Sequence, residues 1–372
     1  MLLQIGFAVL IVAVAAFLIL NALHGLEQIG ITLGFGFLQS SASFSISDKL
    51  IPFEPTDSFG RALLVGLLNT LKVSVIGILI SAILGLFVGI ARLSDNWLVR
   101  KLAGAYVEII RNTPLLVQIF FLYFAVFLTL PTIDRSFSVF DKVFFSNRGT
   151  AIPWFHLNGA WPVWLLLLLA GIVAAVFVWK LRLKKQIEQG KRKYPLLWSI
   201  GSIVVALAAA LAITQASPLA LTVPSVNGRM FEGGYVITSE FASILFGLIL
   251  YTSAFVAEIV RAGIQAVPRG QTEAAKALGL KKGTILRLIV LPQAVRIMVP
   301  PLTSEFLNLV KNSTLAIAVG FTDLFSIGNT IINQTGRSVE IILLIAGVYL
   351  VVSLVISYFM NLFNRHFQLV ER

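Results

Sequence analysis

The chain has 372 residues, of which 58% are hydrophobic and only 12% are charged, whereas soluble domains carry about 25% charged residues. This composition excludes an ordinary soluble enzyme and indicates a membrane protein. The chain has no cysteine and three scattered histidines, which excludes disulfides and thiolate chemistry and disfavours a histidine metal cluster. A formal net charge of +12 would suit nucleic-acid binding only if the basic residues were arranged for it.

Hydrophobic spans follow one another along the chain, each long enough or nearly so for a bilayer, which needs about 20 helical residues. The seventh is the least regular, because Pro300 and Pro301 precede it and the polar run Lys311–Thr314 interrupts it. The pattern predicts an all-α polytopic membrane protein with about eight transmembrane helices. These are expected at Leu2–Leu23, Leu63–Ala91, Thr113–Leu130, Trp161–Trp179, Leu196–Thr214, Phe241–Val260, Leu302–Phe321 and Ile341–Phe363.

Lysine and arginine are concentrated in every second connection between the spans. Nineteen lie in the connections 92–101, 180–193 and 261–296 and in the C-terminal tail, against seven in the connections between them. Because basic residues accumulate on the cytoplasmic side, both termini are predicted to be cytoplasmic. The charge therefore reflects topology, and no nucleic-acid partner is expected.

The connection after the sixth span carries an unusual polar stretch. Alanine and glutamate favour a helix over 272–278, Gly279 can adopt the left-handed geometry that ends it, and Pro292 is expected to stop a second helix. This predicts a cytoplasmic helix-turn-helix with small residues on one side, suited to docking in another protein. The alternative is an ordinary amphipathic hairpin. The residues expected to couple to the partner are Glu273, Ala274, Ala275, Gly279, Ile289, Leu291 and Pro292.

The chain lacks the phosphate-binding loop G-x-x-x-x-G-K-[ST], so any ATP hydrolysis must come from another chain. The spacing "EAA, three residues, G, nine residues, I-x-LP" resembles the EAA loop of ABC-importer permeases. Further segments are similar to permeases of the polar amino-acid uptake family and its general L-amino-acid branch. They are Gly34–Ser47, Gly60–Ser74, Tyr106–Phe124, Glu258–Gly279, Lys311–Ala316 and the extra helical pair Trp161–Thr214.

The resemblance implies a type I ABC-importer permease core with an inserted central helical pair, in a bacterial inner membrane. It implies a second, related permease subunit, two ATPase subunits that carry the ATP and Mg²⁺, and a periplasmic amino-acid-binding protein. This chain is then a non-catalytic transport subunit without a cofactor or metal of its own, working by alternating access.

Within that resemblance the chain divides into four expected parts. Residues 1–60 hold the first helix and an extracytoplasmic segment, and residues 61–130 form the first part of the core. Residues 131–235 hold extracytoplasmic loops and the inserted pair. Residues 236–372 complete the core and contain the coupling loop at about 263–298. The loops 134–154 and 218–234 are candidates for contact with the binding protein.

Candidate pathway residues lie on two polar helix faces. Glu108, Arg111 and Gln118 are expected on one face of the third span, with Thr113 capping its start. The alternatives are a surface ion pair for Glu108 and Arg111 and interhelical contact for Gln118. Glu258 and Arg261 repeat the i,i+3 spacing, typical of a gate or interface ion pair.

The polar run in the seventh span is the other candidate site. Irregular backbone at membrane depth is tolerated only where it lines a cavity or is buried in protein. A half-helix beginning there would direct its N–H groups at a substrate carboxylate; the alternative is a polar hinge. Glu305 is positioned to pair with Lys311 or to receive a substrate ammonium. The run consists of Lys311, Asn312, Ser313 and Thr314.

Two other classes of function stay open from the sequence. A secondary amino-acid transporter would need no ATPase and usually shows inverted repeats, which are not visible here. A membrane scaffold or sensor subunit would require neither the EAA spacing nor the interrupted seventh span.

Overall fold

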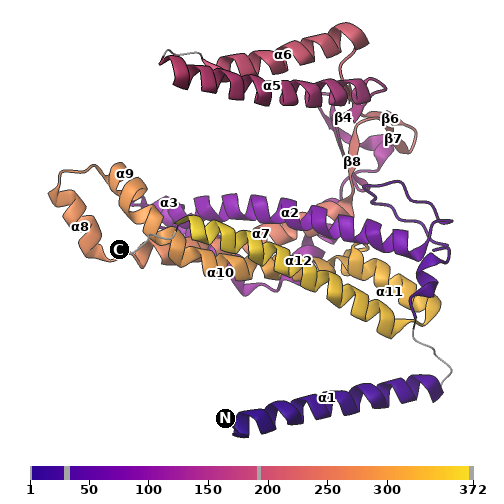
Figure 1. Ribbon diagram of the computed structural model, residues 1–372. Helices are drawn as coiled ribbons and strands as arrows, with labels where there is room; N and C mark the ends of the chain where they lie inside the picture. Colours follow the sequence, from indigo (N-terminus) through magenta and orange to yellow (C-terminus); the bar gives the residue numbers. More distant parts are fainter. Residues whose placement is uncertain (1, 29–33, 191–193, 368–372) are drawn as a thin grey trace. The chain divides into compact units, whose positions relative to one another are not determined.

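The computed structural model describes residues 2–28, 34–190 and 194–367. The chain forms two compact units (Figure 1). Residues 1–122 and 243–372 make up the first, here called the core unit, and residues 123–242 make up the second, here called the inserted unit.

The described chain is mostly helical. Among the described residues, six helices are long and apolar enough to cross a membrane, or seven if the bent pair Trp97–Asn112 and Leu115–Phe127 forms one span. The expected helical membrane architecture is confirmed. The helices before the inserted strands are α1 (Leu2–Gln28), η1 (Gly36–Gln39), α2 (Phe59–Ala91), α3 (Trp97–Asn112), α4 (Leu115–Phe120), the π-helix η2 (Phe121–Phe127) and η3 (Ile133–Arg135). Those that follow are α5 (Trp161–Gln189), α6 (Pro195–Thr214), α7 (Ser239–Gln265), α8 (Arg269–Ala277), α9 (Lys282–Ile285), the π-helix η4 (Leu286–Val290), α10 (Leu291–Asn312), η5 (Ser313–Val319), α11 (Leu324–Thr335) and α12 (Ser338–Phe367).

Small residues let α2 approach α7 and α11 closely. A side chain at Gly85 would lie 2.8 Å from the carbonyl oxygen of Ser253 in α7, and one at Gly66 would lie 2.9 Å from the Cα of Leu324 in α11. Close approach through small residues is the usual means of packing membrane helices, because lipid tails supply no hydrophobic driving force between them. Figure 1 shows α2, α7, α10 and α12 running alongside one another.

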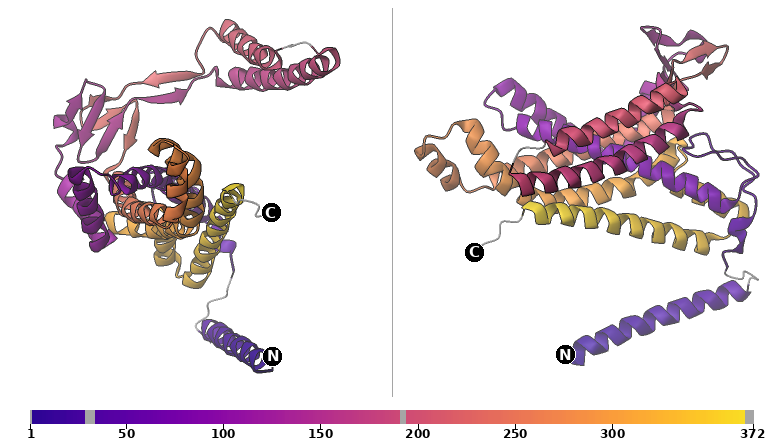
Figure 2. Two further views of the ribbon diagram at one scale, coloured as in Figure 1. Left: turned by 90° about the vertical axis from the view of Figure 1, so that its left-hand side faces the viewer. Right: turned by 45° about the horizontal axis from the view of Figure 1, so that its top comes forward.

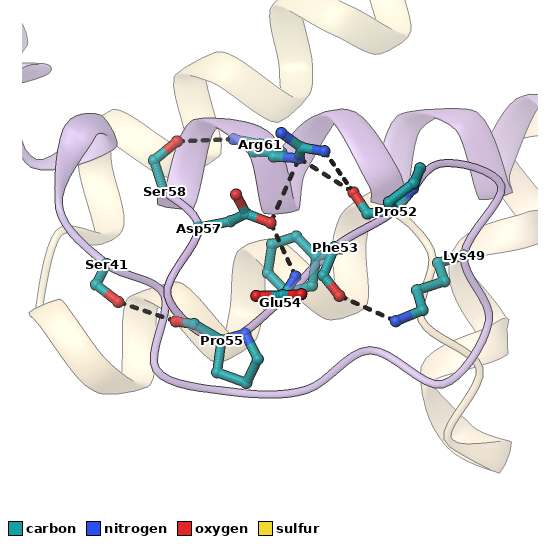
Figure 3. Close-up of polar contacts among 9 residues, drawn as sticks. All are labelled: Ser41, Lys49, Pro52, Phe53, Glu54, Pro55, Asp57, Ser58 and Arg61. Atoms are coloured by element: carbon teal, nitrogen blue, oxygen red, sulfur yellow. Dashed lines mark hydrogen bonds and ion pairs between the residues drawn. The ribbon is translucent and has the colours of Figure 1, made fainter.

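The segment before α2 is held by polar contacts (Figure 3). Ser58 caps the helix, since its hydroxyl accepts a hydrogen bond from the Arg61 amide at 3.3 Å. The Arg61 guanidinium donates to the Pro52 carbonyl at 2.7 Å and lies 3.4 Å from Asp57. The Lys49 ammonium donates to the Phe53 carbonyl at 2.9 Å. These contacts fix the loop over the buried side chains of Phe53 and the first turn of α2.

The inserted unit contains short strands that the sequence did not predict, because three or four residues are too few to show an alternating pattern. An antiparallel sheet has the order β1-β2-β3-β8, and two ribbons pair β4 with β5 and β6 with β7. The strands are β1 (Phe137–Val139), β2 (Val143–Ser146), β3 (Gly149–Ile152), β4 (Trp154–Leu157), β5 (Leu219–Thr222), β6 (Ser225–Asn227), β7 (Met230–Glu232) and β8 (Tyr235–Ile237).

The helices α5 and α6 form the expected central pair and lie side by side (Figure 2). Gly171 permits this contact, since a Cβ there would lie 2.7 Å from the Cβ of Ala206. At one end the Trp164 indole donates to Thr214 Oγ1 at 3.1 Å. Further along the pair, the Ser199 hydroxyl donates to the Ala175 carbonyl at 3.0 Å.

Two expectations about helix geometry are wrong. The face expected to join Glu108 to Gln118 is not continuous: the chain breaks between Asn112 and Leu115 and bends by 104°, because Pro114 disfavours helical geometry in the residue before it. The third span itself begins at Leu115, two residues after its expected start. Pro292 does not stop a helix either. It occupies the first turn of α10, where the missing N–H is harmless, and the preceding π-helix η4 joins α9 to α10 without a break.

Candidate transport site and coupling element

A cluster of opposite charges joins α2 to α7. The Glu258 carboxylate accepts hydrogen bonds from Arg261, with Nε 3.2 Å from each oxygen, and it also forms an ion pair with Arg92 at the end of α2. Arg261 donates onward to Gln265 at 2.5 Å. The i,i+3 pair seen in the sequence is therefore present. The part played by Arg92 was not predictable, because this residue lies 166 positions from Glu258 in the chain.

Arg111 belongs to the same neighbourhood. Its guanidinium lies 4.9 Å from the centre of the Phe255 ring in α7, a cation–π arrangement, and its charge acts on Glu258 and Glu305. No ion pair joins Arg111 to Glu108 among the described residues. A hollow of about 380 Å³ opens here, lined by Arg92, Val107, Glu108, Arg111, Asn112, Phe255 and Glu258.

The side chains of Gln118 and Thr113 form hydrogen bonds with backbone carbonyl groups at the end of α3. The Gln118 amide nitrogen donates to the carbonyls of Ile110 and Thr113, at 2.9 and 3.0 Å, so it satisfies carbonyl groups left over at the end of α3. Thr113 does not cap a helix start: it ends α3, and its hydroxyl donates back to the Ile109 carbonyl at 2.8 Å. The bend after Asn112 removes the continuous face expected to join Glu108 to Gln118.

The polar run Lys311–Thr314 lies at the end of a helix rather than at the start of one. Lys311 is in the last turn of α10, and the chain continues as the 3₁₀ helix η5. The expected half-helix with N–H groups directed at a substrate is therefore wrong here. Ser313 and Thr314 donate to the carbonyls of Val310 and Lys311, both at 2.8 Å.

The exposed side of α10 carries Lys311, which the sequence singled out, and two further polar side chains that sequence reasoning missed, those of Ser304 and Asn308. Ser304, Asn308 and Lys311 are all exposed and recur at i, i+4 and i+7, the spacing of one helix face. The Lys311 ammonium forms no hydrogen bond or ion pair with the described residues. Polar residues at helical spacing in an apolar helix were the available signal.

The predicted helix-turn-helix is α8, Gly279 and α9. Gly279 has φ +74° and no atom within 4 Å of where a side chain would begin, so only its left-handed backbone requires glycine. Ala275 is only 2% exposed and packs in a cluster with Val267, Ile285 and Met298. On the outer side Leu278 is 79% exposed. Glu273 and Ala274 are also exposed, whereas Ile289, Leu291 and Pro292 are half-buried.

Similarity to known proteins extends over nearly the whole chain. The family model described as "Binding-protein-dependent transport system inner membrane component" matches residues 77–368. The putative amino-acid ABC transporter permease protein YhdX of Escherichia coli is 44% identical over 371 residues, covering 99% of this chain and 94% of the relative. The general L-amino acid transport system permease protein AapQ of Rhizobium johnstonii is 43% identical over 353 residues, covering 95% and 88%. The glutamate/glutamine/aspartate/asparagine transport system permease protein BztB of Rhodobacter capsulatus is 40% identical over 400 residues, covering 99% and 93%.

Proposed function

Because the chain belongs to the family of inner membrane components of binding-protein-dependent transport systems, we propose that it is one of two permease subunits of an ABC importer for amino acids. A binding protein delivers the substrate from outside, and a separate pair of ATPase subunits supplies the energy. The amino-acid class rests on the three full-length relatives, all of them amino-acid permeases by name. The second permease is a related chain, as the general L-amino-acid resemblance implies.

The observation that carries this proposal is the way in which α8 is attached to the core unit. Ala275 anchors α8 in a cluster that includes Val260 of α7 and Met298 of α10. A partner that binds the exposed Leu278 and Glu273 and moves α8 therefore also moves α7 and α10. Those two helices carry Glu258, Glu305 and the exposed polar side of α10. Closure of the ATPases then rocks the pathway helices, which is alternating access.

In this proposal the pathway carries both positive and negative charges. Arg111 and the exposed Lys311 supply positive charge for a substrate carboxylate, and Glu305 supplies negative charge for its ammonium group. The Arg92–Glu258–Arg261 cluster closes the cytoplasmic end and opens when α2 and α7 separate. Gln118 and Thr113 hold the bend before α4 in place, so they position the pathway and do not contact the substrate. Residues 131–235 form an insertion between the two parts of the permease core.

The test is uptake by the complete importer in proteoliposomes. Liganded binding protein and ATP should together drive uptake of one or more amino acids from a panel, and omission of either should stop it. Uptake that proceeds without ATP on an ion gradient would instead favour the secondary transporter.

Lys311→Ala should reduce uptake about tenfold, the effect of losing one charge-assisted contact of roughly 1.5 kcal/mol. Lys142→Ala, at an exposed position outside the proposed pathway, is the matched control. Assembly with the ATPase and the binding protein should be unchanged. If Lys311→Ala prevents assembly as well as uptake, its role is structural, at the negative end of the α10 dipole.

A further inference from the structure

Three arginines from two distant segments of the sequence lie around one hollow in the inserted unit. Arg135 ends η3, Arg148 lies in the turn between β2 and β3, and Arg229 lies in the turn between β6 and β7. Together they border a hollow of about 400 Å³, here called the arginine hollow. Its lining is Thr132, Ile133, Asp134, Arg135, Asn147, Arg148 and Arg229.

Arg148 and Arg229 differ from Lys49, Arg61 and Arg337, which are also predicted to be extracytoplasmic. Lys49 and Arg61 are bonded to carbonyl groups of their own loop (Figure 3), and Arg337 pairs with Glu340 at 3.0 Å. In contrast, the guanidinium groups of Arg148 and Arg229 donate no hydrogen bond to any described residue. Both side chains are exposed, and no hydrogen bond to a described residue fixes their orientation.

The hollow already favours a carboxylate. Asp134 accepts a hydrogen bond from the Thr132 hydroxyl, which lowers the pKa of its carboxyl, and the charges of Arg135 and Arg229 lower it further. The Arg135 Nε lies 4.0 Å from the Asp134 carboxylate. The charges of Arg135 and Arg229 act on the Asp134 carboxylate, and Arg148 borders the same hollow. Three arginines and one carboxylate leave the hollow with a positive charge that attracts further carboxylates.

We infer that the arginine hollow receives acidic side chains of the binding protein that delivers the substrate. This partner rests on the proposed function, and the two segments that build the hollow belong to loops predicted to face outward. Exposed arginine beside an exposed methionine is typical of protein interfaces, and Met230, next to Arg229, is 71% exposed. A free amino acid would also need a carboxylate for its ammonium group, and Asp134 is already paired.

Docking of this kind acts chiefly on the rate of encounter. Complementary charges at the rim of an interface steer association, and salt screens them. The concentration of binding protein that half-saturates the importer should therefore rise with ionic strength. Docking at the arginine hollow does not involve contacts within the pathway, so the maximal rate of ATP hydrolysis should not change.

The experiment measures ATPase stimulation of the reconstituted importer against the concentration of its own liganded binding protein. Arg148→Glu and Arg229→Glu should each raise the half-saturating concentration about tenfold, weaken its salt dependence and leave the maximal rate unchanged. Lys142→Glu reverses an exposed charge of the same unit outside the hollow, and its half-saturating concentration should stay within about twofold of the parent.

Two results would overturn the inference. One is a half-saturating concentration for both arginine variants no higher than for Lys142→Glu. The other is glutamate binding to the permease complex without binding protein, abolished by Arg148→Glu, which would make the hollow a substrate subsite. Either result leaves the proposed function standing as long as the parent importer is stimulated by liganded binding protein and takes up amino acids. Absence of that stimulation in the parent refutes the proposed function itself.

Discussion

Asp323 shows how a single buried carboxyl can make the stability of the chain depend on pH. Its side chain is fully buried, and Oδ1 accepts a hydrogen bond from the Ser326 amide at 2.8 Å, which caps α11. Burial raises the pKa of Asp323 to about 6, because removal from water disfavours the charged form. Its other carboxylate oxygen has no hydrogen-bond partner among the described atoms.

The sign of the effect follows from the raised pKa. In the unfolded chain the pKa of Asp323 is near its ordinary value, so the folded state binds the proton more tightly than the unfolded state does. This tighter proton binding stabilises the fold at low pH, and the stabilisation is lost as pH rises through about 6. The loss should reach about 3 kcal/mol at pH 8. Asp323→Asn keeps a good capping residue and should remove most of this dependence. Thermal unfolding in detergent at pH 4 and pH 8, a range that contains most of the loss, checks it; an equal shift for parent and variant would contradict the prediction.

At the scale of single residues, the sequence predicted what local spacing encodes and missed what the fold brings together. The left-handed Gly279 and the Glu258–Arg261 pair were both visible as short-range patterns. Arg92 was not, because only the packing of α2 against α7 places it beside Glu258. Gln118 was assigned to a pathway face that exists only if the helix is straight, and Pro114 makes it bend.

The coupling element leads to a prediction about α8. Proline fixes φ near −65°, whereas Gly279 has φ +74°, so Gly279→Pro should displace α8 and reduce ATP-driven uptake to background. Glu273→Lys should weaken the hold of the ATPase on the exposed side of α8 by reversing a surface charge. Insertion into the membrane should be normal for both variants.

Gly270→Ala is the matched control, since Gly270 lies in α8 with no atom within 4 Å of a new Cβ and alanine favours helix. Uptake and co-purification of the ATPase are the measurements. Uptake near the parental rate in Gly279→Pro would refute the role of this turn in coupling.

At the scale of elements, long apolar runs were predictable and breaks were not. The spans that became α2, α5, α6, α7 and α12 are marked by hydrophobicity alone, which depends on composition rather than on partners. Thr113, next to Pro114, was expected to start a helix, and Pro292 was expected to stop one. Pro114 breaks the chain by 104° and Pro292 sits harmlessly in a first turn, because the outcome depends on whether the missing N–H was needed.

At the scale of the whole molecule, orientation in the membrane is the property on which both proposals depend. The arginine hollow must face outward and α8 must face the ATPase in the cytoplasm. The physical basis is the uneven distribution of lysine and arginine, which is most reliable for short connections. The inserted unit is a demanding test of the predicted orientation. Strands β4 and β5 pair with each other, so α5 must cross the membrane and α6 must cross back to bring both strands to the same side.

Reporter fusions at four positions test this topology. Fusions after Gln186 and after Lys282 should report a cytoplasmic location, because the connections 180–193 and 261–296 each hold seven basic residues. Fusions after Val139 and after Val226 should report an extracytoplasmic location. Val139 pairs with Val143 in the sheet, and Val226 pairs with Phe231 in the ribbon that carries Arg229. A cytoplasmic result at Val226 would mean that α5 and α6 do not both cross the membrane. It would also place Arg229 where no extracytoplasmic binding protein can reach it.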